Sequence, residues 1–393
     1  MNLSNRIENI NAGGSDGWEV YYEARRLAAA GEPVLDLTIG DHDFRTAAPI
    51  IDAMNRSARG GNTGYSPVPG SVALRRAIAA RIEHRTGVET SPESVLVTAG
   101  GQAALFATHL AILEAGATGL FCDPYYATFP GTIRATGATA VAVPTRPQNG
   151  FVPTAEDLRR YIDDTARSVL INSPNNPSGA VYDREALIEI GKVCKENDLW
   201  LISDEVYESQ VWSGEHVSPR SIPELADRTL VIGSLSKSHA MTGFRCGWVA
   251  GPEAAISRLE DLATVSTYGV AGFVQDAAFR AVVQGDQIEA RVANIYRQRL
   301  EVAMDCLSGA NSVLIVPPKG AMYVLLDLSP TGLSGTEFAR RLLEDRRIAV
   351  MPGESFGQAT AGHVRVALTT GSACLKDALN NLVDFAGDLA TRK

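Results

Sequence analysis

The sequence predicts an α/β fold, in which helices cover a largely parallel sheet, together with a smaller α+β domain. The chain has 393 residues, too many for one small core and enough for a large domain plus a smaller one. From about residue 95 to residue 250, short apolar runs alternate with stretches of helical periodicity. These apolar runs lack polar alternation, which is typical of strands buried on both faces of a parallel sheet.

The strands and helices of the larger domain follow one another in chain order. Strands are predicted where apolar residues run together, at SVLVTAG (94–100), TGLFCDP (118–124), SVLINSP (168–174), LWLISDE (199–205) and TLVIGSL (229–235). Helices are predicted between them, at GQAALFATHLAILEAG (101–116), YYATFPGTIRATG (125–137) and DREALIEIGKVCKEND (183–198). Alternation of this kind favours a parallel sheet with helices on its faces.

The end of the chain has a different pattern. A long amphipathic helix is predicted at 291–310, strands at 320–328 and 362–368, and helices at 335–346 and 375–390. We interpret these elements as a second, smaller sheet with its own helices, on which the first 45 residues pack. The predicted division is therefore a large domain of residues 46–290 and a small domain of residues 1–45 and 291–393.

Composition excludes several classes of protein. Hydrophobic residues make up 45% and charged residues 21%, a globular balance, and the net charge of −9 disfavours nucleic acid or anionic lipid as a partner. The five cysteines are odd in number and contain no CxxC pair, which fits reduced thiols better than disulfides or a metal site. The polar first twenty residues are no secretory signal, and no apolar run is long enough to cross a bilayer. We expect a cytoplasmic protein.

Two of the predicted strands are followed by residues suited to bind polar ligands, and in parallel sheets ligands bind beyond the carboxyl ends of the strands. Gly100, Gly101 and Gln102 follow the first strand and open a helix, where the backbone can approach an anion closely. Asn172 and Asn176 follow a later strand, within NSPNNPSG. Taken alone, each of these stretches also fits an ordinary turn.

Asp204 ends the apolar run LWLISD, and Tyr207 follows three residues later. Because a carboxylate is costly to desolvate, Asp204 is expected to meet a cation or hydrogen-bond donors, although it also fits a helix N-cap. The next strand leads into SLSKSHAMTGFRCG (234–247), which carries hydroxyls around Lys237 and an arginine at position 245. An amine nucleophile, an anion-binding arginine, a buried carboxylate, a phenol and an amide together match an aromatic aldehyde with a phosphate and a basic ring nitrogen.

With these residues in place, the sequence resembles the class I and II aminotransferases, the fold-type I enzymes that depend on pyridoxal phosphate (PLP). The resemblance covers nearly the whole chain, and its most specific motif is S-x-S-K followed by G-x-R-x-G, here SLSK and GFRCG. It implies a PLP-transferase fold with a mostly parallel seven-stranded sheet. It also implies that Lys237 forms a Schiff base with PLP and moves the substrate proton, that Asp204 pairs with the pyridinium nitrogen, and that Tyr207 and Asn176 bind the phenolic oxygen.

The same resemblance assigns further residues. The implied phosphate-binding residues are Ser234, Ser236, Arg245, Gly100, Gly101 and Gln102. Tyr126 of DPYYATF would stack on the cofactor ring, and Tyr65 of TGYSPVPG would reach the phosphate from the neighbouring subunit of a homodimer. Arg365 of GHVRVAL would hold the substrate α-carboxylate beside the backbone of Gly40 and Asn176, although alone this arginine also fits a surface strand.

The implied function is transfer of an amino group from an L-amino acid to a 2-oxo acid by a ping-pong mechanism. The pattern looks nearest to the aspartate, aromatic and arginine–pyruvate transaminases, and the donor stays open among these. Asp41 and Asp43 near the expected pocket suit a basic donor such as arginine, although one of them also fits the cap of a turn. His42 stands where the family usually has proline, and we expect it to be an exposed loop residue. His239 is given no role.

Three alternatives were weighed against transamination. A PLP-dependent C–S lyase or other β-eliminating enzyme would use the same fold. A nicotinamide-dependent oxidoreductase would need G-x-G-x-x-G after the first strand, a spacing that TAGGQAA lacks. A non-catalytic regulator on this fold would need a DNA-binding region, for which the chain has neither spare length nor suitable charge.

Overall fold

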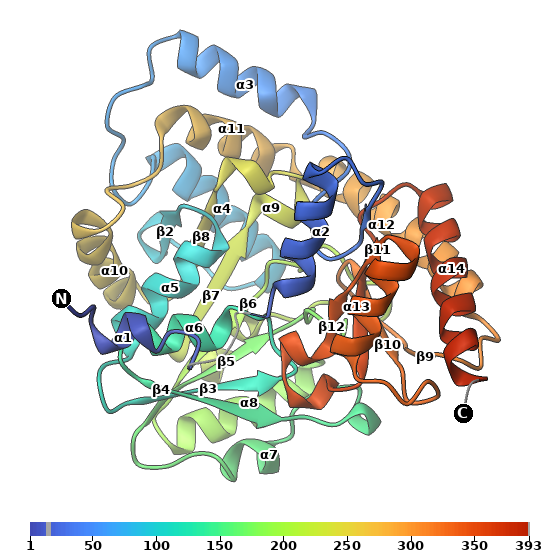
Figure 1. Ribbon diagram of the computed structural model, residues 1–393. Helices are drawn as coiled ribbons and strands as arrows, with labels where there is room; N and C mark the ends of the chain where they lie inside the picture. The colour runs from blue at the N-terminus through green and yellow to red at the C-terminus, as the bar shows by residue number, and fades with distance from the viewer. Residues whose placement is uncertain (13–16, 392–393) are drawn as a thin grey trace.

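Seven strands form the central sheet of the protein, in the order β2-β8-β7-β6-β5-β3-β4 (Figure 1). Their bounds are β2 Val95–Thr98, β3 Thr118–Asp123, β4 Thr139–Pro144, β5 Ala166–Asn172, β6 Trp200–Asp204, β7 Thr229–Ser234 and β8 Gly247–Ala250. All neighbours pair in parallel except β8, which runs antiparallel to both β2 and β7. The computed structural model describes residues 1–12 and 17–391; residues 13–16 of the opening segment and 392–393 of the predicted small domain lie outside the described residues.

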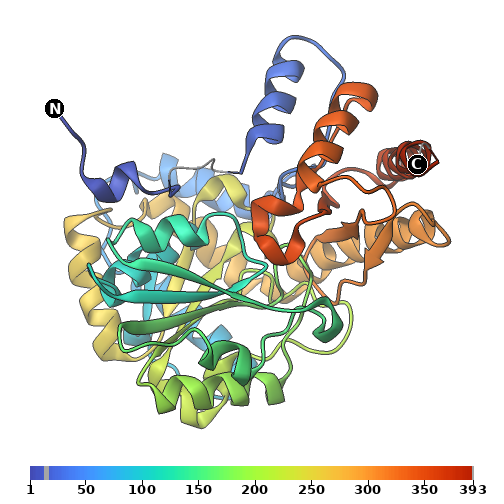
Figure 2. The same ribbon diagram turned by 60° about the horizontal axis from the view of Figure 1, so that its bottom comes forward.

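Helices cover both faces of this sheet, as Figure 2 shows. Successive residues of β5 point to opposite faces: Val169 and Ile171 join a core with helix α8 (Arg184–Glu196), whereas Leu170 joins a core with helix α5 (Gly101–Ile112). The remaining helices of this part of the chain are α3 Ala48–Arg59, α4 Val72–Thr86, α6 Phe129–Arg134, α7 Ala155–Arg159, α9 Leu235–Ser238, α10 Glu253–Val265 and α11 Gly272–Val283. Burial on two faces explains why the strands read as unbroken apolar runs.

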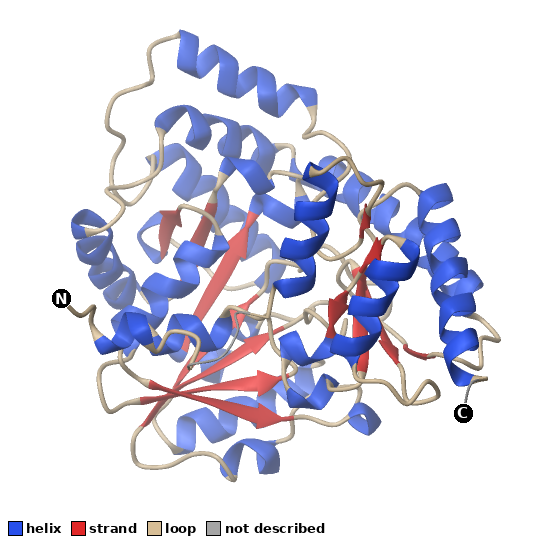
Figure 3. Ribbon diagram, viewed as in Figure 1, coloured by secondary structure: helices blue, strands red, loops and turns tan. Residues whose placement is uncertain are grey.

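A second sheet is antiparallel and has the order β12-β13-β10-β9 (Figure 3). Its strands are β9 Leu314–Val316, β10 Tyr323–Asp327, β12 Met351–Pro352 and β13 His363–Ala367, and its helices are α12 Gly285–Leu307, α13 Gly335–Arg346 and α14 Ser372–Ala390. These elements share one core with Leu37 and with Val20 and Ala24 of helix α2 (Glu19–Ala29). Strand β1 (Leu35–Asp36) pairs in parallel with β11 (Ile348–Ala349), so the N-terminal segment after the short helix α1 (Asn5–Glu8) joins the C-terminal part.

Helix α12 runs without a break through residue 290, where the sequence predicted the domain boundary. The predicted division of the chain therefore stays a prediction. Within residues 1–12 and 17–391, no helix combines the length and the apolar character that crossing a membrane requires.

Candidate active site

A pocket lies where β5, β6 and β7 end, and residues of both sheets line it. Asn172, Asp204 and Ser234 are the last residues of these three strands, and all three line the pocket. Arg365 of β13 and Tyr323 of β10 line it from the second sheet. Arg365 also donates to the carbonyl of Thr38, which lies 327 positions earlier in the chain.

Lys237 lies on α9, directly after β7, and its Nζ donates a hydrogen bond to the carbonyl of Gly40. The Ser234 side chain caps this short helix by accepting from the Ser236 N–H at 3.1 Å, and the two serine hydroxyls are 3.0 Å apart. A Cβ on Gly40 would lie 3.0 Å from Cζ of Tyr323 and 3.4 Å from Nζ of Lys237. Only glycine therefore lets this loop approach the lysine so closely.

Asp204 is buried at the end of β6, and the backbone N–H of Val206 donates to its Oδ1 at 3.2 Å. Burial raises the pKa of Asp204 to about 7, and this hydrogen bond only partly opposes the rise. In the described part of the chain, Asp204 has no ion pair with a lysine, arginine or histidine. A buried carboxylate of this kind fits a cationic ring nitrogen that enters the pocket as part of a ligand.

Asn172 and Asn176 connect two of the strand ends. The Asn172 side chain donates to the Asp204 carbonyl at 3.0 Å and accepts from the Asn176 N–H at 2.9 Å. The Asn176 side-chain oxygen then accepts a hydrogen bond from Arg365 at 2.8 Å. This chain of contacts connects the backbone of Asp204 with the guanidinium of Arg365.

Arg365 is 1% exposed, so it is not the surface-strand arginine that its sequence context alone also fitted. Its guanidinium lies between the rings of Tyr323 and Phe356, with Cζ 4.3 Å from each ring centroid. Its Nε is buried without a hydrogen-bond partner, and no carboxylate among the described residues pairs with it. A buried, orphaned guanidinium edge is the geometry that a ligand carboxylate satisfies with two parallel hydrogen bonds.

Three tyrosines, Tyr126, Tyr207 and Tyr323, line the pocket. The hydroxyls of Tyr207 and Tyr323 are 2.8 Å apart, and Tyr126 lines the same pocket. Burial raises the pKa of Tyr126 to about 12, so its hydroxyl stays protonated. The sequence reading placed Tyr323 in a strand but missed it as a site residue, because nothing local distinguishes it from other strand tyrosines. Trp18 also lines the pocket, and its position in a polar segment offered no signal.

The other end of the pocket is suited to an anion. Gly101 and Gln102 open α5 and line the pocket together with the exposed Arg245, Ser234 and Ser236. Gly100 does not line the pocket but has φ 85° and lies against Arg245, whose Cζ would be 2.8 Å from a Cβ at that position. Two hydroxyls, a cation and the N-terminus of a twelve-residue helix fit a phosphate group.

Tyr65 lies outside this pocket in the chain. Its side chain is 92% exposed and packs edge-to-face on Tyr268, with ring centroids 5.2 Å apart. A role for Tyr65 at the site therefore requires a second subunit.

Two expectations about the segment GDHDF are wrong. His42 is not an exposed loop histidine: its Nε2 lies 3.0 Å from the Ser236 carbonyl and its Nδ1 lies 2.8 Å from the Tyr296 hydroxyl. Asp43 is not free to meet a substrate, because both of its oxygens accept from Arg299 at 2.8 and 2.9 Å. Asp41 does line the pocket, where it accepts from the Thr242 hydroxyl at 2.7 Å.

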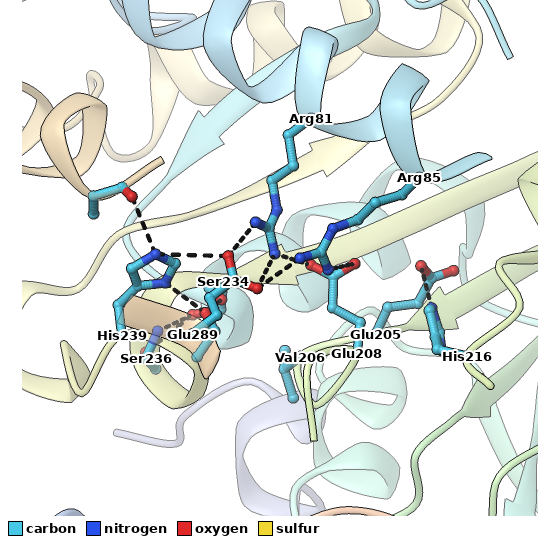
Figure 4. A network of polar contacts seen from close by, with 12 residues as sticks. Arg81, Arg85, Glu205, Val206, Glu208, His216, Ser234, Ser236, His239 and Glu289 are labelled. Atoms are coloured by element: carbon cyan, nitrogen blue, oxygen red, sulfur yellow. Dashed lines mark hydrogen bonds and ion pairs between the residues drawn. The ribbon is translucent and has the colours of Figure 1, made fainter. Parts of the chain in front are cut away.

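A network of ion pairs supports the lysine-bearing turn from behind (Figure 4). Arg81 of α4 bonds Glu208 at 2.7 Å and also bonds Glu289, while Arg85 contacts the same two carboxylates at 2.9 and 2.6 Å. Burial opposes ionisation of Glu208, but the two arginines prevail and lower its pKa to about 2. His239, two residues after Lys237, is fully buried and lies 3.7 Å from Glu289. Burial lowers the pKa of His239 to about 4, so the ring is neutral, and its Nε2 lies 3.1 Å from the Ala281 carbonyl. The histidine without an assigned role therefore anchors the lysine turn to helix α11.

The seven-stranded sheet with its second, smaller sheet defines an aminotransferase fold. The structure resembles that of aspartate aminotransferase from Thermus thermophilus with maleate at a TM-score of 0.92 and 34% identity, over 98% of this chain and 100% of that chain. An aromatic aminotransferase from Pyrococcus horikoshii is similar at a TM-score of 0.87 and 30% identity, over 93% of this chain and 99% of that one.

Residues 32–382 match the family described as aminotransferase class I and II, and the chain belongs to that family. It is 41% identical to the arginine–pyruvate transaminase of Pseudomonas aeruginosa over 390 residues, 99% of both chains. It is 35% identical to the aspartate/prephenate aminotransferase of Thermus thermophilus over 389 residues, 98% of this chain and 99% of the other. The protein is an aminotransferase of a family that typically uses PLP, and the predicted family, fold and class of reaction are confirmed.

Proposed function

We propose that the protein binds PLP at this pocket and transfers the amino group of a basic L-amino acid to a 2-oxo acid. One observation carries the proposal. Lys237, Asp204 and Arg365 line a single pocket, and none of the three has an ionic partner among residues 1–12 and 17–391. A PLP–amino acid pair offers an electrophilic carbon for Lys237, a cationic nitrogen for Asp204 and a carboxylate for Arg365.

The residues at the two ends of the pocket fit PLP in one orientation. Ser234, Ser236, Arg245, Gly101 and Gln102 would hold the phosphate, supported by Gly100. At the other end Asp204 would hold the ring nitrogen, Tyr207 and Asn176 the phenolic oxygen, and Tyr126 one face of the ring. When bound, PLP supplies an aldehyde that condenses with amines and a protonated ring that accepts the electron pair released at the substrate Cα.

The protein residues supply position and proton transfer. Arg365 binds the substrate α-carboxylate through two parallel hydrogen bonds, and its place between two aromatic rings keeps the guanidinium fixed. As a free amine, Lys237 removes the proton from the substrate Cα and returns it on the other side of the C–N bond. The Gly40 carbonyl, which bonds Nζ of Lys237, lies where it can hold the amine close to the substrate carboxylate. Asp204 stays ionised beside the ring nitrogen and keeps that nitrogen protonated.

Charge in the pocket supports a basic donor. The cations that line it are Lys237, Arg245 and Arg365, and each has a role toward PLP or the α-carboxylate. Asp41 is the carboxylate on the lining that is left over for the substrate side chain. A second carboxylate on the donor would be repelled by Asp41, and no cation among the described lining residues would be left to pair with it. The 41% identity to an arginine–pyruvate transaminase points the same way.

A donor screen tests this proposal. With pyruvate and 2-oxoglutarate as acceptors, we expect kcat/KM for arginine or lysine to exceed that for aspartate at least about tenfold, since a charge-assisted hydrogen bond contributes roughly 1.5–3 kcal/mol. Asp41→Asn should remove most of that advantage and leave alanine as a donor unaffected. Indifference to arginine and lysine would end the basic-donor proposal. Release of ammonia and pyruvate, without an acceptor, from an amino acid that carries a thiolate leaving group on Cβ would instead favour the β-eliminating alternative.

We further propose that the working unit is a homodimer in which Tyr65 reaches the partner's pocket. The support is an exposed apolar group around this tyrosine: Tyr65 is 92%, Val265 81% and Tyr268 52% exposed. Such a group on a soluble chain marks an interaction surface. Sedimentation at assay concentration should show a dimer, and Tyr65→Ala should weaken PLP binding about tenfold, whereas Tyr161→Ala, at another exposed tyrosine, should not. An active monomer would contradict the shared site.

A further inference from the structure

The loop of residues 40–46 lies along the lysine-bearing segment of residues 236–242 and is joined to it by four side-chain contacts. These contacts are Gly40 carbonyl to Lys237 Nζ, Asp41 to Thr242, His42 to the Ser236 carbonyl, and Thr46 to the Ala240 carbonyl. The loop is therefore held against the lysine segment at four points. Any movement of the loop changes the position of the carbonyl that holds Nζ of Lys237.

His42 makes the contact next to the lysine in this series. A carbonyl oxygen can only accept, so the hydrogen shared with the Ser236 carbonyl at 3.0 Å belongs to Nε2 of His42. Nδ1 then has no hydrogen and accepts from the Tyr296 hydroxyl at 2.8 Å. The second donor to the Ser236 carbonyl is the Met241 N–H at 3.2 Å. The ring thus bridges helix α12 to the peptide bond that joins Ser236 to Lys237.

The surroundings keep this ring neutral and oriented. The imidazole of His42 packs edge-on against the rings of Phe44 and Tyr296, with ring centroids 5.0 and 5.6 Å apart. Burial first, and then the positive charge of Lys237, lowers the pKa of His42 to about 4, although the carboxylates of Asp41 and Asp43 oppose the shift. The guanidinium of Arg299 lies over the Tyr296 ring at 5.5 Å and pairs with Asp43, which holds the far side of the cluster.

We propose that His42 is a positioning residue for Lys237, acting through the hydrogen bond from its Nε2 to the Ser236 carbonyl. Proline, which the family usually has at this position, has no side-chain donor and could not make this bond. The proposal rests on the proposed binding of PLP to Lys237. The hydrogen bond from His42 then determines the rate at which Nζ of Lys237 reacts with the aldehyde, whereas the phosphate-binding residues determine the affinity for PLP.

Substitutions that keep or lose the donor test the proposal. The glutamine amide reaches the place of Nε2, whereas asparagine is too short and leucine has no donor. Cofactor-free protein is mixed with PLP, and two quantities are measured. The first is the rate at which the absorbance of lysine-bound cofactor develops, as the amine adds to the aldehyde and water leaves. The second is the dissociation constant of PLP. We expect His42→Asn and His42→Leu to slow the rate about tenfold with less than a threefold change in the dissociation constant. The rate for His42→Gln should stay within about threefold of the parent rate. The control variant His84→Leu, at an exposed histidine, should have the parent rate.

The outcomes separate cleanly. A parent that binds no PLP at all contradicts the proposed function and, with it, the positioning role of His42. A parent that binds PLP while its His42 variants show no difference between Asn and Gln contradicts the positioning role alone. If His42→Asn reacts as fast as the parent, or if His42→Gln is as slow as His42→Asn, the proposal is wrong. Should the leucine variant fail to fold, the Gln and Asn pair decides. Equal losses of rate, PLP affinity and thermal stability in all three variants would show a merely structural histidine and also overturn the proposal.

Discussion

Lys237→Ala is expected to lower the transamination rate by about 10⁴-fold, the upper range for loss of a general acid–base group. In the proposed function, one amine both binds the cofactor and moves the substrate proton, and the variant lacks that amine. The fold should remain intact, because the lysine makes one hydrogen bond, to the Gly40 carbonyl, and has no ion pair among the described residues. Turnover of the best donor and circular dichroism of the same preparation measure the two effects.

A matched control for this substitution is Lys192→Ala, at an exposed lysine on α8 whose partner is Glu189. It should leave turnover unchanged. Borohydride treatment of the parent in the presence of PLP should attach the cofactor to the peptide that contains residue 237. Attachment to another peptide, or retained turnover in Lys237→Ala, would falsify the assignment of this lysine.

Asp204→Asn is expected to change stability and activity in opposite directions. Burial raises the folded-state pKa of Asp204 to about 7, above the unfolded value of 3.8, so ionisation destabilises the cofactor-free protein. This cost is absent below pH 3.8, grows as the pH rises to about 7, and is complete above it. At 1.36 kcal/mol for each pKa unit the cost is about 4 kcal/mol at pH 8, which asparagine removes. Activity should fall roughly 10³-fold, because the ring nitrogen loses the charge that keeps it protonated.

Thermal unfolding measures the stability half of this prediction. Without PLP, Asp204→Asn should raise Tm by about 5 °C at pH 8 and by much less at pH 4.5. Saturating PLP should narrow the difference in Tm between the variant and the parent. The parent alone has an aspartate at position 204 whose ionised form the cationic ring nitrogen stabilises. Asp305→Asn, at an exposed aspartate of α12, should change neither Tm nor turnover. An unchanged or lower Tm at pH 8 without PLP would contradict the unpaired state of Asp204.

The elements that carry the site were predictable where a strand is buried on both faces. Strands β2, β3, β6 and β7 lie within the predicted apolar runs, and β5 begins two residues before its run. The last residues of β5, β6 and β7 line the pocket because parallel strands end at one edge of a sheet. Strands β4 and β8 were not predicted. Strand β8 has four residues, and its place between β2 and β7 comes from pairing with strands more than a dozen residues away.

Site residues from the second sheet were harder to predict. Arg365 was found only through the family resemblance, since its strand reads like many others, and Tyr323 was missed for the same reason. Contacts between separate elements bring both to the pocket: the arginine lies over the tyrosine ring, and the tyrosine hydroxyl lies 2.8 Å from that of Tyr207. Sequence spacing carries no information on which side chains two separate sheets bring face to face.

The sequence by itself determined the alternation of strands and helices, the aminotransferase family, and the lysine, carboxylate and arginine types that the chemistry needs. Those features are local, because burial on two faces and a short motif both leave their pattern in neighbouring residues. Only the tertiary structure decided that Asp43 is neutralised by Arg299, that Tyr323 completes the pocket, and that His42 is inside. Burial and pairing depend on groups hundreds of residues away, so the same His-Asp pair reads alike in an exposed loop and beside the lysine of a pocket.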